Sequence, residues 1–397
     1  MYRMDQREVD RIARIVKSGK LFRYVEGSEC ERFEKRYAER LGVKYCTLTA
    51  SGTNALTAAL VALGIGPGDE VLVPACTYMA TAMAVLAVGA IPVVVDIDDS
   101  LTMDPEAADR TVGPRTRAMI PVHMWGVVCD MKRIMRVARK HDLYVVEDAC
   151  QCVGGAYQGR MLGSIGHIGA FSFNYYKNMS CGEGGAVVTS KKAWADRVNC
   201  AVDPCNFYWK GRSGSSAGFA FNGARASEFE GAILNVQLDR LDGMIRSMRR
   251  QKKRILGATA STGLRPARAN SLDDECGSHV MYTFDKEAAA KEFAELTGGI
   301  VTIETGRHVY TEWDQVIAQN GAPHPALNPY TMKENAACRK SFDMKMKTLD
   351  ILRRTVLVAT NPDFKAADVK ALIDRIKSAA ARVLGERTAV PAGRVGA

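Results

Sequence analysis

The chain has 397 residues, of which 47% are hydrophobic and 25% are charged, and its formal net charge is +10. This length and apolar content predict a large domain with a sizeable core and a smaller second domain. The longest apolar run, 80–95, is interrupted by Gly89 and Pro92, which argues against a transmembrane helix of about 20 residues. Basic residues are spread among 44 acidic ones, so we expect partners that are neither membranes nor nucleic acids.

The eleven cysteines show neither a Cys-x-x-Cys motif nor any paired spacing. This pattern predicts reduced thiols, no metal site and a cytoplasmic location. Residues 1–20 alternate charged and apolar side chains in a helical rhythm, so we expect an N-terminal helix there and no signal peptide.

From about residue 44, short β-branched runs alternate with longer helical stretches. The alternation is typical of an α/β fold, in which a seven-stranded, mostly parallel sheet is flanked by helices. Ligands of such sheets bind at the carboxyl ends of the strands, and Ser51, Pro74, Asp148 and Lys177 all follow expected strand ends. We therefore expect one cleft to contain them. The expected strands are 45–49, 70–73, 92–96, 118–122, 143–147, 168–173 and 186–189.

The large domain is expected to span residues 1–245, including the N-terminal helix, and the smaller α+β domain residues 246–385. The last residues, 386–397, have the composition of a flexible tail.

Around the expected domain boundary the periodicity changes. Residues 203–221 are rich in glycine, serine and aromatic residues and predict a long loop. A helix over 227–256 then leads into the smaller domain, with strands near 279–284 and 356–359.

A possible anion site follows the first expected strand. Ser51, Gly52 and Thr53 precede an apolar helix, and free N–H groups at a helix N-terminus can bind phosphate. The plain alternative is that Ser51 only caps the helix. Ser172 can add a hydroxyl to the same anion, or it is an ordinary strand serine.

Asp148 ends the apolar run Val145–Glu147, where an unpaired carboxylate would be costly. A protonated pyridine nitrogen would satisfy it. The alternative is that Asp148 caps the next helix or pairs with a basic residue. Gln151 follows three positions later. Its side chain can reach the site next to Asp148 and hydrogen-bond a phenolic oxygen of the same pyridine ring.

Lys177 completes the pattern, 29 positions after Asp148. A lysine amine forms a Schiff base with the aldehyde of pyridoxal 5'-phosphate, and a carboxylate at the ring nitrogen keeps that ring electron-accepting. The glycines of 182–185 predict a tight turn that leaves Lys177 exposed to the cleft. Tyr78 follows another strand end and can stack on a flat ring, although a lone tyrosine is more often core packing.

These motifs occur together in one order, and they carry a resemblance. The chain resembles the DegT/StrS-like sugar aminotransferases, a family of fold-type I pyridoxal phosphate enzymes, from about residue 27 to 241 and more weakly to about 380. The resemblance rests on the motifs Ser51–Leu56, Gly66–Val71, Gly89–Pro92, Pro121–Gly126, Glu147–Ala149, Phe171–Phe173 with Lys177, and Gly182–Gly185.

The resemblance implies a role for each matching residue. Lys177 looks like the lysine that binds the cofactor, and Asp148 like the partner of its ring nitrogen. Gln151 is similar to the neighbour of the phenolic oxygen, and Tyr78 to the aromatic residue stacked on the ring.

The resemblance also implies phosphate ligands and a dimer. Gly52, Thr53 and Ser172 match phosphate ligands. Asn222 looks like the residue that such enzymes lend to the phosphate of a neighbouring subunit, which implies a homodimer with a shared active site. Here Ala224 stands where the family usually has an aromatic residue.

The chain departs from many nucleotide-sugar relatives between residues 307 and 330, where it has a longer segment. Aromatic residues, histidines and an arginine in a loop can shape a substrate pocket; the candidates are Arg307, His308, Trp313 and His324. The alternative is a packed loop of the small domain.

The resemblance implies an aminotransferase that uses pyridoxal phosphate and its pyridoxamine form. We expect it to move an amino group from glutamate or glutamine to a keto or aldehyde group of a sugar, nucleotide sugar, cyclitol or related natural-product precursor, as in the biosynthesis of amino sugars and antibiotics. One alternative is dehydration or aromatisation of a cyclic ketone. Lys177 argues against dehydration, because sugar dehydratases of the family have histidine there. The other alternative is a sensor that binds the cofactor without turnover.

Overall fold

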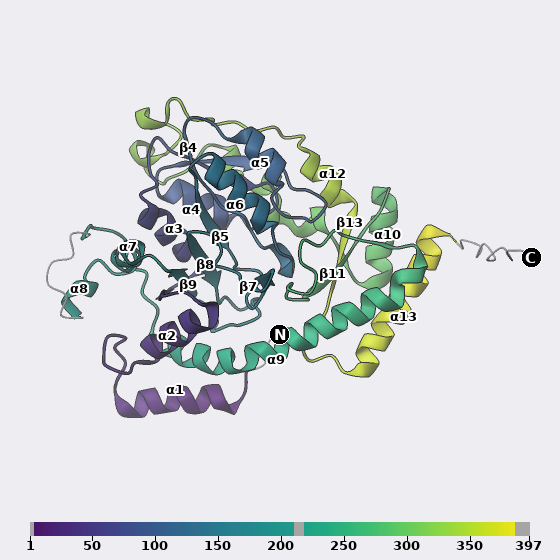
Figure 1. Cartoon of the computed structure of the whole chain (residues 1–397), viewed down its shortest axis with the longest axis horizontal. Coiled ribbons are helices and arrows are strands. Elements are labelled where there is room, and N and C mark those ends of the chain that lie inside the picture. The colour runs from purple at the N-terminus through teal and green to yellow at the C-terminus, as the bar shows by residue number, and fades with distance from the viewer. Residues whose placement is uncertain (1–3, 210–217, 386–397) are drawn as a thin grey trace, which may run out of the picture.

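The structure, a computed structural model, describes residues 4–209 and 218–385. A large α/β body and a smaller C-terminal body are connected by the long helix α9 (Glu228–Thr259), which runs beneath both (Figure 1). In the described part of the chain, no helix combines the length and apolar character needed to cross a bilayer.

The large body contains a seven-stranded sheet in the order β1-β9-β8-β5-β4-β2-β3. The strands from β8 to β3 pair in parallel, and β9 is antiparallel to both of its neighbours. The expected mostly parallel sheet is therefore confirmed. Its strands are β1 (Tyr45–Thr49), β2 (Glu70–Pro74), β3 (Ile91–Val95), β4 (Thr116–Met119), β5 (Tyr144–Asp148), β8 (Ile168–Ser172) and β9 (Gly185–Thr189).

The main difference in strand bounds concerns β4. It begins two residues earlier and ends three residues earlier than the expected strand 118–122, because the chain beyond Met119 leaves the regular ladder. Val122 nevertheless keeps a parallel bridge to Asp148, so the edge of the sheet continues as far as the end of β5.

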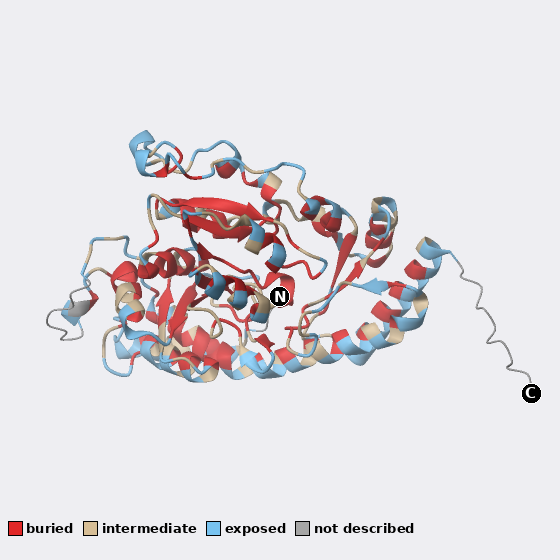
Figure 2. Ribbon diagram, turned by 45° about the horizontal axis from the view of Figure 1, so that its top comes forward, coloured by how far each residue is buried: buried red, intermediate tan, exposed pale blue. Residues whose placement is uncertain are grey.

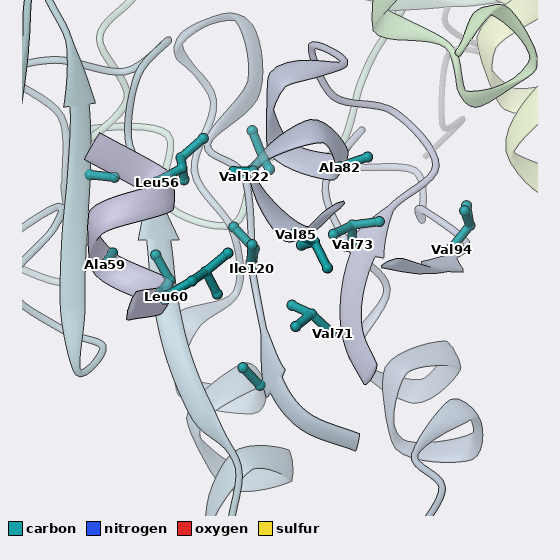
Figure 3. Close-up of a cluster of buried hydrophobic side chains, with 14 of the residues drawn as sticks. Leu56, Ala59, Leu60, Val71, Val73, Ala82, Val85, Val94, Ile120 and Val122 are labelled. Carbon is teal, nitrogen blue, oxygen red and sulfur yellow. The ribbon is translucent and has the colours of Figure 1, made fainter. Parts of the chain in front are cut away.

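Two apolar layers cover the two faces of this sheet. Side chains of a strand point alternately to opposite faces, so Val71 and Val73 join one cluster and Leu72 the other. Figure 3 shows part of the first cluster, where Leu60 and Val85 lie beside Ile120. The first layer is formed by α3 (Gly52–Leu63), α4 (Ala80–Ala87) and α7 (Lys192–Val202), and the second by α2 (Glu29–Leu41), α5 (Pro105–Thr111), α6 (Met131–Lys140) and the N-terminal half of α9.

Two of the helices show why they begin where they do. Ser51 caps α3, its hydroxyl oxygen accepting from the N–H of Asn54 at 3.1 Å. Ser227 and Glu230 form a capping box at the start of α9. The N-terminal helix α1 (Gln6–Ser18) lies along α9, where the buried Glu8 pairs with Arg240.

The C-terminal body has an antiparallel four-stranded sheet in the order β10-β11-β13-β12. It has its own core, formed with α10, α13 and the end of α9. The expected helix over 227–256 and the small α+β body are thus present. The expected boundary at residue 245 falls inside the continuous α9, and the domain limits stay a prediction. The elements are β10 (Arg265–Pro266), β11 (His279–Thr283), β12 (Ile300–Val301), β13 (Thr355–Ala359), α10 (Glu287–Thr297) and α13 (Ala366–Leu384).

The segment between β12 and β13 returns to the large body. Val309, Tyr310, Trp313 and Val316 belong to the first apolar cluster of the large sheet. The alternative of a loop packed within the small domain is therefore wrong for this part of the chain. The segment contains η3 (Thr302–His308), η4 (Tyr310–Glu312), α11 (Asp314–Ile317), η5 (Pro325–Leu327), η6 (Lys333–Asn335) and α12 (Lys347–Arg353).

Burial follows this layered arrangement (Figure 2): buried residues fill the central strands, and buried and exposed residues alternate along α9. The expected loop 203–221 contains a short helix, α8 (Asn206–Trp209), and its residues 210–217 lie outside the described part of the chain, as does the expected tail 386–397. The ribbon of β6 (Ala156–Tyr157) and β7 (Arg160–Met161) completes the fold.

Candidate active site

Asp148 is the last residue of β5, at the carboxyl edge of the sheet, and its side chain is buried. One carboxylate oxygen accepts from the hydroxyl of Thr81 at 2.9 Å, and the other from the N–H of Cys150 at 3.1 Å. In residues 4–209 and 218–385, no Lys, Arg or His lies within ion-pair distance of Asp148. The residues between Asp148 and β6 form turns and no helix, so the bond from Cys150 N is a turn contact and the expected helix cap is absent. A carboxylate has about four acceptor positions, so this buried side chain can take a further N–H donor.

Thr81 was not among the residues expected in the site. It lies on the first turn of α4, and its hydroxyl is also 2.8 Å from that of Thr77. The available signal was its position three residues after Tyr78, on the first turn of the helix that follows this tyrosine. The chain from Thr77 to Thr81 therefore brings an aromatic face and a hydroxyl to the same edge as Asp148.

The start of α3 faces Ser172, the last residue of β8. Ala55 donates the first intrahelical hydrogen bond, to Ser51 O at 3.0 Å, so the amides of Gly52 and Thr53 precede the helical ladder. A Cβ atom on Gly52 would lie 2.7 Å from Ser172 Cβ and 3.1 Å from its hydroxyl oxygen. Only glycine fits here. Helix amides and a serine hydroxyl thus share a small cradle suited to an anion.

Lys177 lies in the turn that connects β8 to β9, and its own N–H donates to Asn174 O at 2.9 Å. The strands close around it through bonds from Phe173 N to Gly184 O (2.8 Å) and from Tyr175 N to Gly182 O (2.9 Å). Gly182 and Gly184 have φ angles of 92° and 157°, which non-glycine residues rarely adopt. The expected tight return of the chain is therefore present.

The charge of Lys177 acts on two groups of the site. Burial raises the pKa of the Cys150 thiol, the charge of Asp148 raises it further, and Lys177 opposes both. Burial also lowers the pKa of His308, and the positive charges of Lys177 and Arg307 add to that effect. Lys177 is thus close enough to act on the neighbour of Asp148 and on the segment after β12.

Arg307 and His308 reach the site by backbone pairing. Thr77 N donates to His308 O and Met79 N to Arg307 O, both at 3.0 Å. The ring centres of Tyr78 and His308 are consequently 5.5 Å apart, and the guanidinium carbon of Arg307 is 6.0 Å from the centre of the Tyr78 ring. Tyr78 is 38% exposed, so its ring remains available for stacking.

Two further expected cofactor residues lie near the cradle but make no diagnostic contact. Gln151 is half-buried in the turn after β5. Asn222 is exposed, two residues before Ala224, whose carbonyl accepts from Ala50 N at 2.8 Å. Asn222 thus lies on the surface beside the loop that enters α3. The roles assigned to both residues stay predictions.

Two residues expected to bind substrate lie elsewhere in this chain. Trp313 has no exposed surface, and its indole N–H donates to Arg307 O at 3.2 Å. It supports the backbone of Arg307 from within the apolar core. His324 is exposed and accepts from Ala326 N in its own turn. Its segment packs near Gly89 and Gly68, at the amino ends of β3 and β2, which is the opposite edge of the sheet.

Trp125 belongs to the Pro121–Gly126 motif of the family resemblance, but the sequence did not predict that it lies in the site. Its ring centre lies 5.8 Å from that of His308, and the same imidazole ring also contacts Tyr78. Six segments from different parts of the chain therefore meet at one edge: the start of α3, the loop before α4, residues 121–126 after β4, the end of β5, the turn after β8 and the segment after β12.

Known proteins share both the sequence pattern and the fold. The chain is 36% identical over 82% of its length to an L-glutamine:2-deoxy-scyllo-inosose aminotransferase of Streptomyces fradiae, covering 79% of that protein. It is 41% identical over 53% of its length to a GDP-perosamine synthase of Caulobacter vibrioides, of which it spans only 56%. The structure of DesV from S. venezuelae matches with a TM-score of 0.76 and 28% identity, covering 94% of each chain.

The family comparison covers most of the chain. The model of the DegT/DnrJ/EryC1/StrS aminotransferase family matches residues 2–303, which contain nearly every residue of the site just described. Those residues have the order and spacing that led to the expected resemblance, which is thereby confirmed. The chain belongs to the DegT/DnrJ/EryC1/StrS aminotransferase family.

Proposed function

We propose that the chain is a pyridoxal phosphate-dependent aminotransferase that moves an amino group from an amino acid, glutamate or glutamine, to the ketone of a cyclitol or sugar. The observation that carries the proposal is Asp148: a buried carboxylate without a cationic partner in the described residues, at the same edge as the Gly52 cradle and Lys177. The family uses pyridoxal phosphate as its cofactor.

The residues present fit this cofactor. Ser172 and the amides of Gly52 and Thr53 would bind its phosphate, and Asp148 would accept from its protonated ring nitrogen. Bound there, the cofactor supplies a ring that accepts electrons from the carbon being aminated. The exposed face of Tyr78 would cover that ring, and Gln151 would donate to its phenolic oxygen.

The reaction further needs groups that move protons and hold substrates. The amine of Lys177, when free, can move a proton to or from the reacting carbon of either substrate. Thr81 and the N–H of Cys150 hold the Asp148 carboxylate in place, and burial excludes water from it. The exposed guanidinium of Arg307 can bind the carboxylate of the amino donor.

The similarity to the S. fradiae aminotransferase supports a cyclitol or sugar ketone as the acceptor, and with it a role in amino-sugar or antibiotic biosynthesis. We also propose a homodimer with a shared site. Support comes from exposed aromatic side chains on this body, Phe22, Trp209, Tyr176 and Phe229, and from the exposed Asn222 beside α3. All eleven cysteines are free thiols, which supports a cytoplasmic location.

The test combines labelling with half-reactions. Borohydride treatment of the protein saturated with pyridoxal phosphate should attach the cofactor to Lys177, as mass spectrometry detects. Adding glutamate or glutamine should abolish the visible absorbance of the bound cofactor, and 2-deoxy-scyllo-inosose or a nucleotide-linked keto sugar should restore it. Lys177→Ala should lose label and turnover, whereas Lys132→Ala, on the exposed face of α6, should keep both.

The same experiment separates the alternatives. A sensor would bind the cofactor but leave its absorbance unchanged when an amino donor is added. A dehydratase or aromatising enzyme would transform the cyclic ketone without incorporating nitrogen from the donor, which isotope labelling of the product reveals.

A further inference from the structure

Trp125 has an unusual backbone conformation. Its φ and ψ angles of 49° and 29° lie in the left-handed region, although it is neither glycine nor asparagine, and its side chain is only 7% exposed. Such a conformation persists in a large residue only where surrounding contacts enforce it, and it is found preferentially at functional sites. The contacts around Trp125 therefore deserve a functional explanation.

The first residue of β11 and the residues just before it, in the C-terminal body, hold this backbone. Trp125 O accepts from the hydroxyl of Ser278 at 2.9 Å, and Nδ1 of His279 lies 3.1 Å from the same oxygen. A Cβ atom on Gly126 would lie 2.2 Å from the Ser278 hydroxyl oxygen, so glycine is required next to Trp125. Cys276 N also donates to Gly126 O at 2.9 Å. Residues 276, 278 and 279 of the C-terminal body therefore hold the backbone of Trp125 and Gly126 in place; we call these contacts the clamp.

The clamped residue packs its indole on His308. The ring planes are inclined by 54°, and on another side the imidazole packs on Tyr78 at 55°. Because the imidazole contacts both the indole of Trp125 and the ring of Tyr78, the position of Trp125 limits how the His308 ring can rotate.

One nitrogen of His308 is occupied and the other is available. Nδ1 lies 3.0 Å from Thr305 O, a carbonyl that can only accept, so Nδ1 carries the proton. In the described residues Nε2 has no hydrogen-bond partner, which makes it a free acceptor. Burial favours this neutral form, because it lowers the pKa of His308, and the charges of Lys177 and Arg307 act in the same direction.

We propose that Trp125 is a positioning residue, which holds His308 with Nε2 toward the site so that this nitrogen accepts a hydrogen bond from a hydroxyl group of the keto acceptor. The inference rests on the proposed aminotransferase function and adds a recognition element for it. A polyhydroxylated ring, such as a cyclitol or a sugar, offers hydroxyl donors next to its ketone, whereas glutamate offers this nitrogen no donor except its reacting amino group. Trp125 and His308 should therefore affect the half-reaction with the keto acceptor and not the half-reaction with glutamate.

The first test separates the two half-reactions. Trp125→Leu and His308→Ala should each raise the KM for the best acceptor about tenfold, which corresponds to one lost hydrogen bond. The rate with glutamate as the amino donor should change less than twofold. Trp125→Phe, which keeps an aromatic face, should recover most of the loss. The double variant should be no worse than either single variant, because both changes remove the same interaction.

A second test reads the imidazole directly and needs no turnover. In protein labelled with ¹⁵N-histidine, the His308 resonances, assigned by their loss in His308→Ala, should show the Nδ1-protonated tautomer. Trp125→Phe should preserve that pattern, and Trp125→Leu should give a mixture of tautomers. Ser278→Ala, a milder change in the clamp, should shift the resonances in the same direction if Trp125→Leu does not fold.

The outcomes distinguish the two proposals. If the unchanged protein transfers no amino group with any donor, the proposed function and this inference both fail. If it is active but Trp125→Leu keeps its acceptor KM and the His308 tautomer, only the positioning role is wrong. Equal losses in both half-reactions, or additive effects in the double variant, would likewise overturn the inference by indicating general packing.

Discussion

Thr81 donates its hydroxyl hydrogen to Asp148 across 2.9 Å, from the first turn of α4 to the end of β5. Both side chains are buried, and 67 positions separate them in the sequence. A hydrogen bond to a buried carboxylate fixes its orientation, and Asp148 keeps further acceptor positions besides those used by Thr81 and Cys150.

Replacing Thr81 by valine should lower kcat/KM for amino transfer on the order of tenfold. The shape is retained, but the carboxylate loses a bond worth about 1.5–3 kcal/mol and is no longer held in one orientation. Steady-state kinetics measures the effect. Thr297→Val is the control, since this buried threonine donates to Phe293 O at 2.7 Å in α10, far from the site, and should leave kcat/KM unchanged. A Thr81→Val enzyme with kcat/KM within twofold of the parent would contradict the role.

Replacing Gly52 by alanine should disturb the cradle at the start of α3. The new methyl group would lie 2.7 Å from Ser172 Cβ, too close for both to stay, so we expect a loss of about 1–3 kcal/mol in stability and weaker binding of pyridoxal phosphate.

Gly257→Ala on α9 is the matched control for this change, because nothing lies within 4 Å of its added Cβ. Alanine favours helix by up to about 1 kcal/mol, so this variant should be as stable as the parent or slightly more. Urea unfolding and titration with the cofactor test both variants. Equal cofactor affinity in Gly52→Ala would show that the cradle has no role in binding.

Replacing Glu147 by glutamine should destabilise the fold by about 2–4 kcal/mol. The fully buried carboxylate accepts from Gly163 N at 2.9 Å and from Ile165 N at 2.6 Å, and His123 Nε2 lies 3.3 Å away. A glutamine would turn an N–H₂ group toward N–H donors and leave them unsatisfied.

The matched control is Glu106→Gln, which alters an exposed pair with Arg133 and should cost less than about 1 kcal/mol. Urea unfolding of both variants at neutral pH gives the comparison. Similar losses in the two variants would refute the structural role of Glu147.

Stability should fall in acid partly because of His279. Burial lowers the pKa of its imidazole to about 4, whereas an unfolded histidine has a pKa of about 6.5. Between these values the unfolded chain binds a proton that the folded chain does not, so this contribution is complete above pH 6.5 and is lost as the pH falls toward 4. It amounts to up to roughly 3 kcal/mol.

His279→Gln keeps an N–H donor for Trp125 O but does not titrate. Urea unfolding between pH 7.5 and 4.5 should therefore show a smaller loss of stability in this variant than in the parent. An identical pH dependence in the two proteins would exclude His279 as a source of the acid sensitivity.

Local patterns predicted the sheet, and they placed several of the expected cofactor residues at its carboxyl edge, for a physical reason. A buried parallel strand is a short β-branched run, and a carboxylate or lysine directly after it must lie at the carboxyl edge. Asp148, Ser172 and Lys177 could therefore be placed without knowing which strands are neighbours. The expected small body was recognisable in the same way, from two strand-like runs that became β11 and β13.

Such local patterns could not predict which residues far apart in the sequence contact each other. Thr81 joins Asp148 only because β2 and β5 lie in one sheet with β4 between them. Arg307 and His308 reach Tyr78 because their backbone pairs with residues 77–79, more than 200 positions earlier. Trp313 and His324 belong to the same stretch of aromatic residues and histidines as His308, so the sequence could not separate them. Trp313 is buried in the core, and His324 lies at the opposite edge of the large sheet.

The amino-acid sequence by itself determined the order of the strands along the chain, the chemical groups at their ends and hence the class of cofactor, since these depend on neighbours within a few residues. The tertiary structure alone decided which groups face one another: the bond from Thr81 to Asp148, and the clamp from Ser278 through Trp125 to His308. Side-chain partners far apart in the chain are chosen by how the layers pack, and packing is a property of the whole fold.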